Sequence, residues 1–199
     1  MSRVRTFACA TLVLLAGGCT ATPGFAPVDV TRYHLDVPHE RGTVTVQPVA
    51  GPKGVTPEYQ LYADAVARAL AATGYAAAPD PAASDYIAGV SFLRETRGVL
   101  RERSPVSIGI GGGSWGGGFG LGAGASIPIG RGRTRNLFVN ELAVQLRRRS
   151  DNTVIWEGRA QMEAIQGDNT SQPTAAADRM ASALFKGFPG ESGVSITVK

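Results

Sequence analysis

One serine of the chain lies in the spacing that serine hydrolases use for their nucleophile. Residues 112–116 (GGSWG) fit G-x-S-x-G, in which a strained strand-to-helix turn exposes the serine hydroxyl to a histidine base. No helical pattern follows Ser114, and both histidines of the chain, His34 and His39, precede it, whereas in that fold the histidine comes after the serine. We therefore predict no catalytic residue and no enzymatic activity, and keep a hydrolase that acts through Ser114 as the alternative.

Two further spacings could bind a cofactor or a metal ion. Residues 111–116 also fit G-x-G-x-x-G, but a dinucleotide site needs a helix directly after such a loop, and no helical pattern follows. Residues 34–40 contain two histidines and two acidic residues that could act as ligands. This stretch is extended and interrupted by proline, so it needs partners from elsewhere to hold a metal ion tetrahedrally. We expect neither a cofactor nor a metal site.

The first nineteen residues have the layout of a secretory signal. Arg3 and Arg5 precede a short apolar run, residues 7–16, which is too short to span a bilayer as a helix. The sequence LAGGC, which ends at Cys19, resembles the bacterial lipoprotein signal. That resemblance implies that residues 1–18 are removed and that Cys19 becomes the acylated N-terminus, with a fatty acid such as palmitate. An ordinary secretory signal that happens to contain a cysteine is the alternative.

The sequence of the mature chain limits where the protein can be located and what it can bind. Thr20 follows the cysteine, whereas the sorting rule for lipoproteins kept at the inner membrane uses aspartate there. We therefore expect a lipid anchor in the outer membrane, facing the periplasm. From Cys19 to Lys199 the chain has 18 Lys and Arg against 16 Asp and Glu, which does not favour nucleic-acid binding. With Cys9 removed and Cys19 acylated, no thiol remains for a disulfide.

The apolar patterning predicts a single α+β domain that follows a tether. Residues 19–32 are small and rich in proline and are assigned to the tether, and residues 33–199 to the domain. The segments predict an antiparallel sheet with two helices packed on one face. The expected strands are residues 43–47, 85–93, 136–147, 153–165 and 193–198, and the expected helices are residues 57–73 and 171–187.

The first helix has both of its ends marked in the sequence. Thr56 can cap the helix, Pro57 suits its first position, and Gly74 suits the left-handed residue that ends it. One apolar stripe runs between these ends, so this helix is expected to cover the core. We expect Trp156, on the strand 153–165, to be buried against this helix.

A glycine-rich β-hairpin is predicted for residues 106–130. Apolar residues alternate with glycine or other small residues along both arms, 106–111 and 118–129, and residues 112–117 form the tip. Three interpretations stay open: the apolar face folds onto the core, it is an exposed patch for a partner or the membrane, or the segment is a mobile loop. The possible interaction residues are Trp115, Phe119 and Leu121.

Two groups of arginines flank this hairpin and a later turn. Residues 131–135 (RGRTR) alternate arginine with other residues, and residues 147–149 are three consecutive arginines. Both groups could contact anionic lipid headgroups. The alternative is a solvated strand edge that charge protects against pairing with another strand.

Several segments recur in an order typical of one bacterial family. They are ALAATGY (69–75), SDYIAGVSF (84–92) and VIWEGRA (154–160), together with the lipoprotein signal, the glycine-rich middle and the C-terminal helix. In this order they resemble the bacterial lipoprotein family built on domain of unknown function four-one-three-six. The resemblance covers nearly the whole mature chain and implies no activity, because none is established for the family. Trp156 and Gly158 match the family best and are interpreted as packing residues.

These observations together predict a non-enzymatic, lipid-anchored cell-envelope protein with a binding or scaffolding role. The expected contacts are the membrane, through the N-terminal lipid, and an envelope protein partner. Direct membrane contact through residues 106–130 is a further alternative to the hydrolase.

Overall fold

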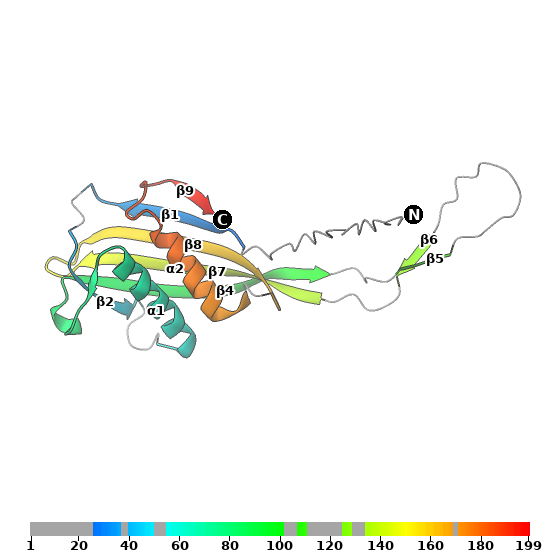
Figure 1. Cartoon of the computed structure of the whole chain (residues 1–199), viewed down its shortest axis with the longest axis horizontal. Coiled ribbons are helices and arrows are strands. Elements are labelled where there is room, and N and C mark those ends of the chain that lie inside the picture. The colour runs from blue at the N-terminus through cyan, green and yellow to red at the C-terminus, as the bar shows by residue number, and fades with distance from the viewer. Residues whose placement is uncertain are drawn as a thin grey trace, which may run out of the picture.

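A seven-stranded sheet, covered on one face by two helices, forms the body of the chain (Figure 1). This computed structural model describes residues 26–36, 40–49, 55–101, 107–110, 125–128, 134–168 and 171–199. The strands of the sheet follow the order β3-β2-β4-β7-β8-β1-β9, and β5 and β6 form a separate pair. The elements are β1 (Val28–His34), β2 (Thr43–Pro48), α1 (Pro57–Ala72), β3 (Ala76–Ala77), the 3-10 helix η2 (Pro81–Ala83), β4 (Tyr86–Arg101), β5 (Ser107–Ile110), β6 (Ala125–Pro128), β7 (Thr134–Arg148), β8 (Val154–Ile165), α2 (Pro173–Phe185) and β9 (Ser195–Val198).

The sheet mixes parallel and antiparallel neighbours. β2 runs parallel to β3 and to β4, whereas the other neighbours within the seven strands are antiparallel. The expectation of an antiparallel sheet is therefore wrong. The physical reason is the connection after β2, because α1 crosses over the sheet before β3 and β4 begin, and parallel neighbours need such a crossover.

β1 lies in the segment that the sequence assigned to the tether, residues 19–32. Val28 and Val30 are fully buried, and β1 pairs with β8 on one side and with β9 on the other. The tether assignment is therefore wrong for residues 28–32. Apolar and polar side chains do alternate there, but a strand this short becomes recognisable only beside the two strands that it joins.

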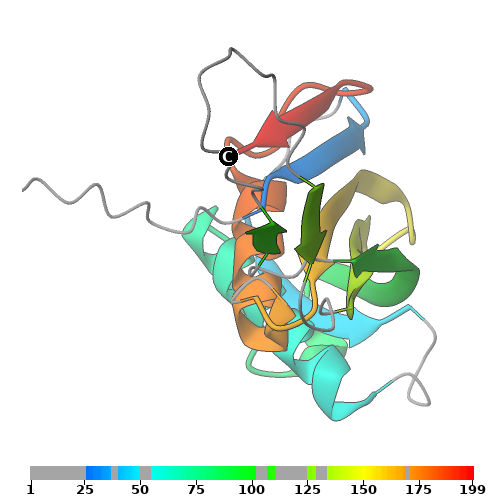
Figure 2. The ribbon, with the colours of Figure 1, turned by 90° about the vertical axis from the view of Figure 1, so that its right-hand side faces the viewer.

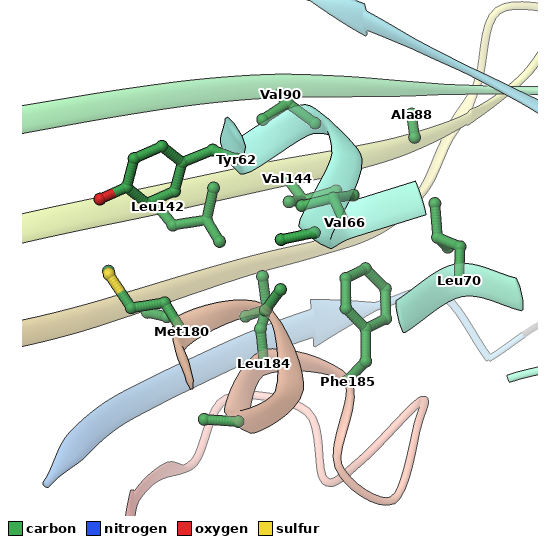
Figure 3. Packing of buried hydrophobic residues seen from close by; sticks show 14 of the residues in the cluster. Tyr62, Val66, Leu70, Ala88, Val90, Leu142, Val144, Met180, Leu184 and Phe185 are labelled. Atoms are coloured by element: carbon green, nitrogen blue, oxygen red, sulfur yellow. The ribbon is translucent and has the colours of Figure 1, made fainter. Parts of the chain in front are cut away.

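Both helices start at the same end of the domain. The Thr56 hydroxyl accepts a hydrogen bond from the Tyr59 amide at 3.0 Å, and Gly74 adopts a φ of +97° after α1, so the predicted ends of this helix are confirmed. The first turn of α1 lies beside Arg94 of β4, near the end of the sheet where β4 leaves it. Figure 2, viewed from that end, shows both helices on the same side of the sheet. Apolar side chains from both helices meet those of β4 and β7 in the core (Figure 3).

Trp156 is buried in the core, as predicted, but under the other helix. Its side chain is fully buried, and its ring stacks on Phe185 of α2 at 5.2 Å between centroids. Its indole N–H donates a hydrogen bond to the Pro189 carbonyl at 3.0 Å, just beyond α2. The space for the indole exists because Gly158 has no side chain: a Cβ there would lie 2.8 Å from Leu184 Cδ1 and would collide with the indole itself. The expectation that α1 covers Trp156 is wrong, and α2 covers it.

Arg32 of β1 caps the C-terminal end of α2. Its Nε and Nη2 donate hydrogen bonds to the carbonyls of Leu184 and Ala183 at 2.8 and 2.9 Å, and the residue is buried. The last turn of α2 has no basic residue of its own. Because the final carbonyls of a helix lack partners within it and bear partial negative charge, this arginine supplies both hydrogen bonds and opposite charge.

We predict that Gly158→Ala destabilises the domain by about 1–3 kcal/mol, the usual cost of overpacking a core. Trp156→Ala alone should cost about 3–5 kcal/mol. Once the indole is absent, its collision with the added Cβ disappears and the Leu184 side chain has space to move aside, so the double variant should be less destabilised than the sum of the two, as measured by denaturant unfolding. Gly98→Ala is the matched control, because a Cβ at Gly98 has no heavy atom within 4 Å and should leave stability nearly unchanged. Strict additivity of the two core substitutions would contradict this packing.

Candidate functional site

Most of the candidate site residues from the sequence analysis are not among the residues that the structure describes. Cys19, Ser114, Trp115, Phe119 and Leu121 lie outside them, so their predicted roles stay predictions. Of the possible metal-binding stretch 34–40, the described part is 34–36 and Glu40. Across the described parts of the chain no group of three or more His, Cys, Asp or Glu side chains is arranged to hold a metal ion.

β4 and β7 continue beyond the rest of the sheet as a two-stranded ribbon. The two strands pair from Tyr86↔Arg148 to Arg101↔Thr134, whereas β8 follows β7 only as far as Leu137. We call residues 98–101 and 134–136 the ribbon; Figure 1 shows it extending past both helices. A bulge at Arg97 shifts the register just before it.

The ribbon exposes apolar side chains between basic ones. Val99 is 56% exposed and Leu100 is 40% exposed, and Arg97 and Arg101 flank them on the same strand. Beyond the ribbon, β5 and β6 pair antiparallel from Ser107↔Pro128 to Ile110↔Ala125. The pairing agrees with the predicted arms over these residues, while 118–124 and the tip lie outside the described residues.

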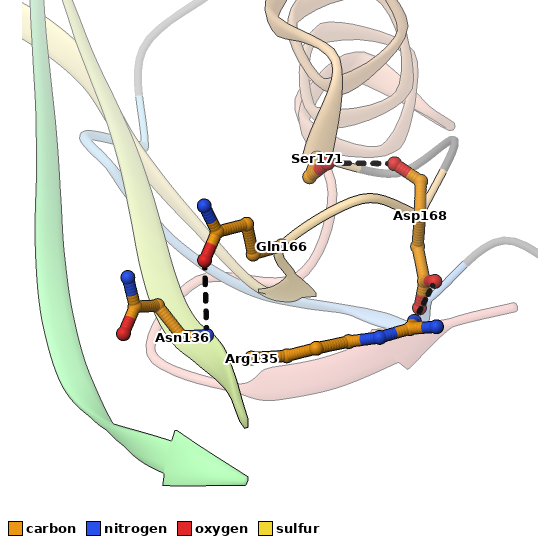
Figure 4. A network of polar contacts seen from close by, with 5 residues as sticks. All are labelled: Arg135, Asn136, Gln166, Asp168 and Ser171. Carbon is orange, nitrogen blue, oxygen red and sulfur yellow. Dashed lines mark hydrogen bonds and ion pairs between the residues drawn. The ribbon is translucent and has the colours of Figure 1, made fainter. Parts of the chain in front are cut away.

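Polar contacts fix the base of the ribbon to the connection between β8 and α2 (Figure 4). Arg135 forms an ion pair with Asp168 at 2.9 Å, and the Asn136 amide donates a hydrogen bond to Gln166 Oε1 at 3.3 Å. The Ser171 hydroxyl in turn donates to the Asp168 carbonyl at 2.6 Å. The direction in which the ribbon leaves the domain is therefore coupled to the start of α2.

A half-buried arginine lies where the core ends and the ribbon begins. Arg94 Nε donates a hydrogen bond to Asn140 Oδ1, across the strand pair, at 2.9 Å, and Arg94 Nη1 lies 3.4 Å from Glu58 Oε1 of α1. The guanidinium carbon lies 5.7 Å from the centroid of the Phe138 ring. We call Glu58, Tyr59, Tyr62, Arg94 and Asn140 the Arg94 cluster. The strand pattern could have shown it, since Arg94 continues, at a spacing of two, the row of the buried Val90 and the partly buried Phe92.

The Arg94 cluster has more polar atoms than hydrogen bonds. Its buried atoms without a hydrogen-bond partner in the described part of the chain are Tyr59 OH, Tyr62 OH, Arg94 Nη2 and Asn140 Nδ2, whereas Glu58 Oε1 has the ion pair with Arg94 in place of a hydrogen bond. Burial raises the pKa of the Tyr59 and Tyr62 hydroxyls, so both stay protonated at neutral pH. A hollow of about 380 Å³ lies beside Glu58, Tyr59 and Arg94. Each unpaired buried group costs about 1–3 kcal/mol, so maximal stability does not explain the cluster.

We predict that Arg94→Met destabilises the protein by about 1–3 kcal/mol, because it leaves Asn140 Oδ1 and the Glu58 carboxylate without their partner. Adding Asn140→Leu should recover most of that loss, since replacing both partners by apolar groups of similar shape is nearly neutral. Denaturant unfolding of the two variants measures the difference. A double variant less stable than Arg94→Met would show that the cluster does stabilise the fold.

A polar groove at the opposite end of the domain joins three loops. It has a volume of about 510 Å³ and is lined by Arg41, Asp85 and Arg149, among others. Asp85 Oδ2 accepts hydrogen bonds from the Thr43 amide and hydroxyl at 2.8 and 2.7 Å, and Arg149 donates to the Pro81 and Ser84 carbonyls, both at 2.7 Å. These charged side chains are used to hold loops together, so we assign the groove a structural role.

The groove predicts a pH dependence of stability. The Thr43 hydrogen bonds hold the pKa of Asp85 below its ordinary value of 3.8, so its stabilising effect is present at neutral pH and is lost as the pH falls through that lowered pKa. Asp85→Asn should therefore be less stable than the wild type at pH 7, and the difference should shrink below about pH 4. Urea unfolding at several pH values measures this. A difference that stays constant down to about pH 2 would contradict the assignment.

The fold and these sites define a single-domain α+β protein with a mixed sheet. The chain belongs to the family described as Domain of unknown function (DUF4136), whose model matches residues 43–190. It is 33% identical, over 213 residues, to an uncharacterized protein of Zymomonas mobilis subsp. mobilis, with 87% of this chain and 80% of that relative covered. In the described residues no helix has the length and apolar character needed to cross a membrane.

Solved structures resemble the chain only distantly. A PDZ domain protein from Parabacteroides distasonis gives a TM-score of 0.48 at 8% identity; 87% of this chain is covered, but the chain spans only 39% of that protein. The PelC dodecamer from Paraburkholderia phytofirmans gives a TM-score of 0.42 at 12% identity, with 78% of this chain and 93% of that chain covered. These likenesses are too weak to support a functional argument.

Proposed function

We propose that the chain is a lipid-anchored cell-envelope protein that acts by binding or scaffolding rather than by catalysis. The support for the anchor is the signal in residues 1–19, which ends at Cys19, and the start of β1 at Val28 soon after it. The proposed location is the outer membrane, facing the periplasm, because Thr20 stands where inner-membrane retention uses aspartate. The family adds no activity to this proposal, because its domain has no known function.

The observation that best supports a binding role is the ribbon. The two paired strands leave the helix-covered sheet and expose Val99 and Leu100, and this exposure does not stabilise the domain. Exposed apolar side chains gathered at one place favour contact with another surface. The glycine-rich residues 106–130 follow from this ribbon in the chain, which makes them the proposed contact segment, with Trp115 at its centre.

Two alternatives are separated by simple experiments. A hydrolase acting through Ser114 would be labelled by an activity-based serine probe, and the label would disappear in Ser114→Ala. Direct contact of the contact segment with lipid would persist in a protein that lacks its acyl chains.

The anchor is tested by fatty-acid labelling in the native host or a close bacterial relative. We predict that the wild-type protein is labelled, that Cys19→Ala is not, and that the mature chain begins at Cys19. Cys9→Ala is the matched control, because Cys9 lies in the removed signal and its loss should leave the label in place. Label that survives Cys19→Ala would refute the anchor.

The same membrane preparation tests the binding role. Partners that co-purify with the wild-type protein should be lost when residues 106–130 are replaced by a short glycine-serine linker. Thermal unfolding of the deletion variant should remain cooperative, because the core cluster is built from buried side chains of the seven-stranded sheet and the two helices. A deletion that abolishes cooperative unfolding would place residues 106–130 in the core and remove the proposed contact role.

A further inference from the structure

The chain enters the domain at the end from which the ribbon leaves. Val28, the first residue of β1, pairs with Met162 of β8, and Met162 pairs with Asn140 of β7, which lies opposite Arg94. These residues form one row across the sheet, and the ribbon starts only a few residues beyond it. β1 runs away from this row toward His34, so its first residue, Val28, lies on the ribbon side of the domain (Figure 1).

The segment from Cys19 to Val28 and the segment of β4 from Arg94 to Arg101 can span similar distances from this row. Eight residues separate Cys19 from Val28, so an extended chain places an acylated Cys19 at most about 30 Å from the row. β4 continues from Arg94 to Arg101, a further rise of about 23 Å at the usual rise per residue in a strand. An anchor at Cys19 therefore keeps the membrane surface within a distance that the ribbon and the chain beyond it can cover.

Basic side chains gather at this end of the described structure. Arg94, Arg97 and Arg101 follow one another along β4, Arg135 lies opposite on β7, and Glu95 is the acidic residue among them. Glu58, Glu163 and Asp168 also lie here, and each pairs with an arginine. Both helices start at this end and turn the positive ends of their dipoles toward it.

The far end of the domain has the opposite arrangement. The C-terminal carbonyls of both helices lie there, and arginines neutralise them: Arg32 meets α2, and Arg41 Nε donates a hydrogen bond to the Thr73 carbonyl after α1 at 2.7 Å. The arginines of the far end are thus used inside the structure. Arg101 at the ribbon, by contrast, is exposed on the outermost pair of β4 and β7.

We infer that the ribbon end is a docking surface for anionic phospholipid headgroups of the membrane that holds the anchor. Arg101 meets the headgroup phosphates, and the exposed Arg97, which pairs with Glu163 at 3.2 Å, lies beside it. The exposed Val99 and Leu100 lie at the boundary between headgroups and acyl chains, where a small apolar area beside basic charge is favourable. The inference rests on the proposed lipid anchor for the identity of that membrane, but the surface itself binds without the anchor.

Vesicle flotation of the unlipidated mature chain, residues 19–199 with Cys19→Ser, tests this surface. The protein should float with vesicles of phosphatidylcholine mixed with phosphatidylglycerol, stay unbound with phosphatidylcholine alone, and be released by high salt. Arg101→Ser should weaken binding about fivefold, as expected for one basic residue near an anionic surface. Lys186→Ser, which removes one exposed charge at the far end, is the matched control and should leave binding unchanged.

The possible outcomes separate this inference from the proposed anchor. Equal losses for Arg101→Ser and Lys186→Ser would mean unspecific charge attraction and would overturn the docking surface, as would equal binding to both vesicle types or none to either. Missing fatty-acid label on the wild-type protein would refute the anchor alone and leave the flotation result standing. Loss of a co-purified protein partner in Arg101→Ser, without any vesicle binding, would assign the surface to a protein instead.

Discussion

The burial of Trp156 is the constraint on which the packing of α2 against the sheet depends. The indole occupies the space that Gly158 leaves open on its own strand, stacks on Phe185 and donates its N–H to the Pro189 carbonyl. These contacts hold the end of α2 and the turn after it against the sheet. Arg32 donates hydrogen bonds to the Leu184 and Ala183 carbonyls at the same end of α2. One large side chain therefore packs where the end of a helix, a turn and a buried cation meet.

The features that could be predicted from the sequence are those that depend on residues close to one another in the chain. The ends of α1 could be predicted because Thr56, Pro57 and Gly74 act within one turn of the helix. The burial of Trp156 followed from the alternation of its strand. The helix that covers it did not, because both helices have an apolar stripe and only their tertiary arrangement decides which one lies over β8. The parallel pairing of β2 was missed for the same reason, since alternation along a strand says nothing about the direction of its neighbour.

The Arg94 cluster lies at the end of the core, at the point where the ribbon begins. Along β4 the row that faces the core passes from Val90 and Phe92 to Arg94, and on the paired strand β7 it passes from Leu142 to Asn140. A polar row allows the two strands to leave the helix layer without exposing a large apolar face. Sequence reasoning could have located this change from the inward-facing arginine, but not its partners, because Glu58 approaches from α1 and Asn140 from a strand 46 residues later.

The position of β1 between β8 and β9 determines the order in which the chain can fold. Val28 pairs with Met162, which lies 134 residues further along the chain, and also with Val198, the last residue but one. Contacts of such long sequence separation form slowly, because the intervening chain must be ordered first. In a chain that becomes available from its N-terminus onward, β1 arrives first and its partners arrive last. Until β1 has paired, β8 has an open edge that another strand could occupy, so pairing with a wrong strand is the main hazard at this stage of folding.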